Sequence, residues 1–221
     1  MIKRNRSLAH LKTKQFDAAL LDTGFPDFGS EPSEKALFRA AEALYSLSRF
    51  DECRDVLETL CAKFPNNQRG SVVLARAQAR CLEKYTGKYD FKLLRREAKK
   101  LRPPQLDHAT YIGPVEIREV TGKGRGLFTT KTVKAGDLLL CEKAFCHAYI
   151  PEEGAGNSKT TLLVNSETEK GFVGGQADLV RLIAQKLFRN PSLAPAFKLL
   201  HHGSYESVGT ALVDGTPIVD T

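Results

Sequence analysis

Three glycines lie close together near the middle of the chain, in the stretch TGKGRGLFTTKTVKAGDLLL from Thr121 to Leu140. Glycine adopts positive φ at little cost and lets a ligand approach the backbone closely. With the basic residues between them, Gly122, Gly124 and Gly126 could present backbone N–H groups and a cation to a carboxylate. Glycine is also the usual residue of hairpin turns. The pattern alone leaves both a ligand-binding loop and a tight turn open.

The glycine pattern differs from two common nucleotide-binding loops. A dinucleotide-binding GxGxxG loop opens a helix, whereas the sequence LFTTKTV follows here and is rich in β-branched and aromatic residues, as strands are. A phosphate-binding P-loop would end in GK[ST], and this stretch does not. The glycines are therefore expected to connect two strands.

Strands are predicted on both sides of the glycines. VEIREV, which begins at Val115, alternates apolar and charged residues as a half-buried strand does. After LFTTKTV, the residues VKAGD predict a turn, and LLLCEKAF predicts a buried strand that ends near Phe145. The glycines would thus form a loop at the start of a β-rich region.

Two segments of the N-terminal half align with each other at a fixed offset. LAHLKTKQFDAALLD matches EALYSLSRFDECRDV so that Phe16 falls on Phe50 and Asp17 falls on Asp51, 34 residues apart. A period of 34 is that of the tetratricopeptide repeat, a pair of antiparallel helices. Small residues are expected where the helices approach closely, and larger ones between neighbouring pairs. The small residues are Ala40, Ala41 and Cys53, and the larger ones are Leu44, Phe50, Leu57 and Leu60.

A third, irregular unit follows Pro65, which ends the preceding helix because proline cannot donate a backbone hydrogen bond. QRGSVVLARAQARCLEKYTG predicts a long helix that ends near Gly87, and DFKLLRREAKKL predicts its partner helix with Asp90 as N-cap. We interpret this unit as a degenerate or capping repeat. The first repeat begins partway through its first helix, so further sequence upstream is expected.

The helical period stops at RPPQLDHATYIGP, where adjacent prolines favour extended backbone. We predict helical repeats in residues 1–102, a linker in 103–113 and a β-rich domain in 114–221. Within the last, the sequence from Gln176 to Asn190 predicts a helix, and PSLAPAFKLLHH predicts a shorter one that Gly203 ends. The predicted fold class is α+β with more than one domain.

The stretch VEIREVTGKGRGLFTTKTVKAGDLLLCEKAF resembles the start of the SET domain, the fold of S-adenosylmethionine-dependent protein-lysine methyltransferases. With the repeats upstream, the chain resembles fungal-type proteins in which repeats precede SET. It is similar in part to the SET-and-MYND group, although the MYND zinc cysteines are absent. The resemblance implies S-adenosylmethionine as cofactor and a loop that contacts its methionine part. The implied contacts are Lys123, Gly124, Arg125, Gly126 and Leu127.

SET enzymes also use a later segment that contains Asn-His, and a C-terminal tyrosine, to position the lysine amine. None of the five histidines of this chain follows an asparagine, and Tyr205, the last tyrosine, lacks the sequence that surrounds the catalytic one. No cysteine follows Cys146, so a post-SET zinc cluster is missing too. We therefore expect a partial SET domain with a helical insert, without catalytic residues, and an inactive chain.

The chain is basic, with a net charge of +7, which favours acidic partners. Part of the excess lies between Lys92 and Arg102, where KLLRREAKKLR carries six basic residues against Glu97. Apolar residues at spacings of three and four mark the opposite side, which favours an ordinary solvated helix face. Nucleic-acid binding is the weaker interpretation, because no aromatic or polar reading residues interleave with the charge.

The cysteines indicate a reducing compartment. The chain has five of them and no CxxC pair, which favours free thiols in a nuclear or cytoplasmic protein over disulfides or zinc ligands. No metal site is predicted. No apolar run approaches the roughly 18 residues that would span a bilayer, and no apolar segment follows the basic N-terminus as in a secretory signal.

Two functions follow from these observations. The first, implied by the SET resemblance, is a protein-lysine methyltransferase whose repeats help to position a protein substrate. The second is a non-enzymatic scaffold, in which the repeats bind a protein partner and the SET-like region has no catalytic role.

Overall fold

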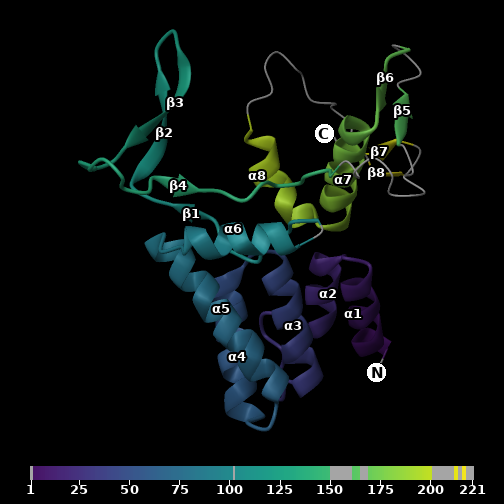
Figure 1. Cartoon of the computed structure of the whole chain (residues 1–221). Coiled ribbons are helices and arrows are strands. Elements are labelled where there is room, and N and C mark those ends of the chain that lie inside the picture. Colours follow the sequence, from purple (N-terminus) through teal and green to yellow (C-terminus); the bar gives the residue numbers. More distant parts are fainter. Residues whose placement is uncertain are drawn as a thin grey trace. The chain divides into compact units, whose positions relative to one another are not determined.

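The computed structural model in Figure 1 describes residues 2–101, 103–149, 161–164, 169–200, 212–213 and 216–217. Two compact units form, one from Thr23–Lys143 and one from Met1–Asp22 together with Ala144–Thr221. The combination of helices with small two-stranded sheets confirms the α+β class. The domain boundaries predicted from the sequence stay a prediction.

Three helices form the core of the Thr23–Lys143 unit. They are α3 (Glu34–Ser46), α4 (Phe50–Lys63) and α5 (Gln68–Thr86), and α4 packs against both of the others. The Ser33 side chain caps α3 by accepting from the Ala36 amide, and Asn67 caps α5 in the same way. All residues predicted to pack between helices are buried: Ala40, Ala41, Leu44, Phe50, Cys53, Leu57 and Leu60.

The same turn occurs twice, at the 34-residue offset that the sequence predicts. In the other unit it joins α1 (Ile2–Lys12) to α2 (Phe16–Thr23), and in this unit it joins α3 to α4. Lys14 and Ser48 both have φ of 61°. Each turn is closed by a similar bond, from the Lys14 amide to the Leu11 carbonyl (3.1 Å) and from the Ser48 amide to the Tyr45 carbonyl (3.0 Å).

Helix α6 (Phe91–Lys100) forms as predicted but does not complete a third helix pair. Gly87, with φ of 63°, ends α5, and the Asp90 side chain accepts from the Leu93 amide at 2.9 Å. However, α6 does not lie along α5 as α4 does, and none of its residues is buried. The expected pairing is wrong because α6 is held to the chain that follows it, through Glu97, rather than to α5.

Two small sheets follow the helices. Strand β1 (Tyr111–Ile112) pairs with β4 (Leu140–Cys141), and β2 (Val115–Val120) pairs antiparallel with β3 (Gly124–Thr129). The expected half-buried strand is wrong, since Ile117 of β2 is 69% exposed. The expected long buried strand before Phe145 is reduced to β4. In both cases no second layer of the described residues covers the strand, so the apolar pattern is left on the surface.

The second unit contains the predicted helix as α7 (Gly175–Arg189), followed by η1 (Pro191–Leu193) and α8 (Ala194–Lys198). Asn190 ends α7, and its side-chain oxygen accepts from the Phe16 amide at 2.7 Å, which ties α2 to α7. The sequence did not predict the hairpin of β5 (Leu162–Val164) and β6 (Gly171–Val173). A further two-stranded sheet joins β7 (Leu212–Val213) and β8 (Thr216–Pro217).

Some predictions fall outside the described residues, namely those on His201, His202, Gly203 and Tyr205. Among the helices that are described, none is long and apolar enough to cross a membrane.

Candidate functional site

The five residues predicted to contact a cofactor lie at one end of the β2–β3 hairpin. The expected three-glycine loop is shorter than predicted, because only Gly122 lies in the turn while Gly124 and Gly126 belong to β3. Gly122 and Gly124 have φ of 71° and 76°, which favours glycine at both positions. The turn closes with a 2.9 Å bond from the Lys123 amide to the Val120 carbonyl.

The backbone of this hairpin tip is open. A Cβ atom added at Gly122 or Gly124 would meet no atom within 4 Å, and Leu127 is 54% exposed. At Gly126 an added Cβ would approach the Phe128 ring to 2.9 Å, so this glycine has a packing role. The hairpin tip brings Lys123 and Arg125 close to the open backbone at Gly122 and Gly124. Their role in cofactor binding stays a prediction.

The segment before the hairpin is fixed to α5 by a polar network around Glu83, which is 8% exposed. The Glu83 carboxylate accepts from the Ala109 amide (2.9 Å) and from Arg80 (2.7 Å), and it lies 2.7 Å from His108 Nδ1. His108 Nε2 lies 3.0 Å from Glu97 of α6, so one imidazole bridges two carboxylates. The predicted linker is therefore attached to both α5 and α6.

A second group of bonds fixes the same segment at Asp107. Its carboxylate accepts from the Tyr45 hydroxyl of α3 (2.8 Å) and from Arg76 of α5 (2.7 Å). Partial burial alone would raise the pKa of Asp107, but the hydrogen bonds from Arg76 and Tyr45 outweigh it and lower that pKa below its usual range. Burial, together with the bond to Asp107, raises the pKa of Tyr45. The Asp107 carboxylate is thus occupied by Tyr45 and Arg76, which indicates a structural role.

The thiols of the helical core also lack the environment of a reactive group. Burial, with the nearby Cys81, raises the pKa of Cys53 to about 12, and its Sγ lies 3.3 Å from the Ala41 carbonyl oxygen. A thiol with so high a pKa stays protonated at neutral pH and is a poor nucleophile. Cys53 is therefore a packing residue, as its place in the repeat predicts.

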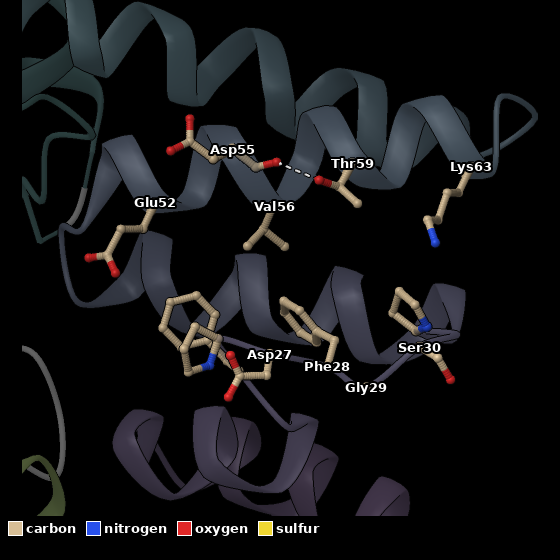
Figure 2. A pocket seen from close by; sticks show the side chains of 12 residues that line it. Asp27, Phe28, Gly29, Ser30, Glu52, Asp55, Val56, Thr59 and Lys63 are labelled. Carbon is tan, nitrogen blue, oxygen red and sulfur yellow. Dashed lines mark hydrogen bonds between the residues drawn. The ribbon is translucent and has the colours of Figure 1, made fainter.

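A pocket of about 420 Å³ lies between α4 and the loop that precedes α3. Phe28 and Val56 provide apolar walls from the loop and from α4, and Figure 2 shows them facing each other. Phe28 packs edge-on against Phe25, with ring centroids 5.9 Å apart. Phe28 has φ of 50°, a conformation that is costly for a bulky residue. The loop thus holds an aromatic side chain against the α4 surface in a strained backbone.

The two ends of this pocket differ in charge. Asp27, Glu52 and Asp55 lie toward one end and Lys63 lies at the other (Figure 2). Glu52 is partly neutralised, because its oxygens accept from Arg49 at 2.6 and 2.5 Å. The arrangement suits a short segment of polypeptide with an apolar side chain at its centre and a basic residue on the acidic side.

Neither the pocket nor the network was predicted from the sequence. The loop GFPDFGSEP carries two phenylalanines in a connection between helices, where polar residues are usual, and this was the available signal for the pocket. The network had no comparable signal. Asp107 bonds to a residue 62 positions away and His108 to one 25 positions away, and no local pattern predicts such pairs.

Comparison with known proteins places the chain beside one relative. It is similar to a protein of Gibberella zeae named methyltransferase, with 42% identity over 217 residues. The match covers 98% of this chain and 30% of the relative, so the chain spans less than a third of that protein's length. No protein-family profile and no solved structure matches the chain. The similarity extends over both the helices and the β2–β3 hairpin.

Proposed function

We propose that this chain forms part of an S-adenosylmethionine-dependent protein-lysine methyltransferase, in which tetratricopeptide-type repeats precede the front of a SET domain. The observation that carries the proposal is the 42% identity, along 98% of the chain, to a relative named methyltransferase. The resemblance of Val115–Phe145 to the start of the SET domain adds the cofactor and the lysine substrate. The recurring turn at Lys14 and Ser48 supports the repeats.

The hairpin tip would hold the methionine part of the cofactor, which supplies the methyl group. Its carboxylate would accept hydrogen bonds from backbone N–H groups near Gly124 and from the side chain of Lys123 or Arg125. The open space at Gly122 and Gly124 supports this role, because a ligand can reach the main chain there. We expect no methyl transfer from the 221 residues alone, since the Asn-His segment is absent from them.

Titration of the ¹⁵N-labelled chain with S-adenosylmethionine tests the cofactor site. At millimolar ligand we expect amide shifts confined to residues 122–127, because a partial pocket binds weakly. A Gly124→Val variant should abolish these shifts, and Ile117→Thr, on the facing strand opposite Leu127 and outside the five predicted contacts, should keep them. Unchanged amides at the tip, or shifts spread over the helices, would rule out this site.

We also propose that the repeats bind a protein substrate or partner, and that the pocket between Phe28 and Val56 receives one of its apolar side chains. Binding of short peptides with an apolar residue next to a lysine tests this, measured by fluorescence anisotropy. Phe28→Ala should weaken binding about tenfold or more, as loss of an interface aromatic does. Val72→Ala, an exposed position on α5, serves as control. Equal affinity of both variants would contradict the proposal.

A non-enzymatic scaffold is the second candidate. It is favoured by the pocket between α4 and the loop before α3, which could bind a partner whether or not the β2–β3 hairpin binds a cofactor. Peptide binding without any shift at residues 122–127 would select the scaffold. For either function we propose a nuclear or cytoplasmic location, which imaging of a fluorescent fusion would test.

A further inference from the structure

Helix α6 carries a band of positive charge on its surface, beyond anything that the proposed methyltransferase or scaffold function needs. Lys92, Arg95, Arg96 and Lys99 follow one another at spacings of one, three and four, which places them on one side of the helix. Lys100 borders them, and all five side chains are exposed. We call these five residues the α6 basic face.

The two acidic residues nearest to Lys92, Arg95, Arg96 and Lys100 are bonded elsewhere. Glu97, the one acid in α6, turns toward His108 at 3.0 Å. Asp90 accepts from the Leu93 amide as the helix N-cap. Among the described residues, Lys92, Arg95, Arg96 and Lys100 have no carboxylate within ion-pair distance. Five other arginines of the same unit do have one: Arg49, Arg54, Arg76, Arg80 and Arg118.

Helix stability does not account for the α6 basic face. Cations stabilise the last turn of a helix and destabilise the first, where the macrodipole is positive. Lys99 and Lys100 lie in the last turn, but Lys92 lies in the first, which has no acidic residue. Nor does the face cover a helical partner, because α6 does not lie along α5. Neither the helix dipole nor packing against a helix therefore requires this charge.

We propose that the α6 basic face binds the phosphate backbone of nucleic acid. A row of four or five cations on a ten-residue helix matches the regular, closely spaced charges of that backbone. Phe91, 55% exposed, stands one turn before Arg95 and can stack on an unpaired base. An accessible aromatic side chain therefore lies beside the cations of the α6 basic face.

An anionic membrane fits the helix less well. A helix that lies on a bilayer needs a continuous apolar stripe opposite its cations. Phe91 and Leu93 are the exposed apolar residues within α6. They are two positions apart, so they lie about 200° apart around the helix axis and share no stripe. Leu94 and Ala98, which would complete a stripe, are only partly exposed. The cations are thus the main accessible feature of α6.

Fluorescence anisotropy of labelled 20-nucleotide DNA, single-stranded and duplex, tests the proposal with the whole 221-residue chain. We expect micromolar dissociation constants at low salt. For four to five phosphate contacts, affinity should fall with salt by a log–log slope of about −3.6 to −4.5 on duplex and about −2.8 to −3.5 on single-stranded DNA. Arg95→Gln with Arg96→Gln should reduce the magnitude of the slope by about 1.5. Glutamine keeps the helix propensity, so circular dichroism should be unchanged.

The matched control removes the same charge elsewhere in the unit. Lys35→Gln with Lys131→Gln changes two exposed lysines, one in α3 and one just after β3. This variant loses only long-range attraction, so its affinity should stay within about twofold of that of the unaltered chain. Equal weakening by both double variants would overturn the proposal in favour of general charge. Binding to phosphatidylserine vesicles but to neither DNA would overturn it in favour of a membrane. A preference between the two DNAs tells whether Phe91 contributes.

Discussion

Two neighbouring segments of the Thr23–Lys143 unit differ sharply in how they are held. Residues 105–110 have no regular secondary structure, yet Glu83, Arg76 and Tyr45 fix them to α5 and α3. The β2–β3 hairpin that follows has regular structure and a complete register, yet its side chains are mostly exposed. Regular hydrogen bonding within a segment thus says little about how firmly the segment is attached to the rest of the molecule.

The largest expected effect comes from breaking the attachment at Glu83. Glu83→Ala removes the acceptor for the Ala109 amide, Arg80 and His108, and should lower the free energy of unfolding by about 3 kcal/mol, since buried partners lose their bonds. Urea unfolding measures this. Glu58→Ala, at an exposed carboxylate of α4, is the control and should cost less than about 0.5 kcal/mol. Similar costs for both would show that the network does not anchor the segment.

A smaller effect is expected at Asp107, and it should depend on pH. Asp107→Asn weakens the bonds from Arg76 and Tyr45 and should cost about 1 kcal/mol at pH 7, because the carboxylate is half exposed. The pKa of Asp107 is lowered in the folded state, so its contribution is present above the unfolded pKa of about 4. It is lost as pH falls through the folded pKa.

Unfolding curves between pH 7 and pH 2 check this prediction. The difference in stability between the unaltered chain and the Asp107→Asn variant should shrink toward the acid end. A difference that stays constant over this range would mean that the ionised carboxylate is not what matters.

The smallest effect is expected in the hairpin. Ile117→Thr keeps a β-branched residue on an exposed strand position and should change the free energy of unfolding by less than about 0.5 kcal/mol. Leu57→Ala, in the buried core of α4, should cost about 3 kcal/mol in the same assay. A large cost at Ile117 would indicate that another surface covers the hairpin in solution.

The contrast also explains which features the sequence could predict. The end of α4 before Pro65, the cap at Asp90 and the end of α5 at Gly87 follow from residues close to one another in the chain, and all three are confirmed. The 34-residue offset predicted equivalent turns for the same reason.

Predictions that needed knowledge of distant surroundings were less successful. The alternation of VEIREV predicted a strand, and β2 is one, but what covers a strand depends on residues elsewhere. The prediction that α6 packs along α5 as a helix pair was wrong, and Glu97 of α6 instead contacts His108 of the following segment. The sequence predicted a glycine loop between two strands, and a turn is present at Gly122. That residues 123–127 bind a cofactor stays a prediction.

Hydrogen exchange along the 221-residue chain tests the central contrast most directly. We predict that the amide of Ala109, bonded to the buried Glu83, exchanges nearly as slowly as amides of the α4 core. Amides of residues 116–128 should exchange much faster despite their β pairing, because few buried contacts hold the hairpin closed. Protection of the hairpin equal to that of α4, or rapid exchange at Ala109, would contradict this account of the molecule.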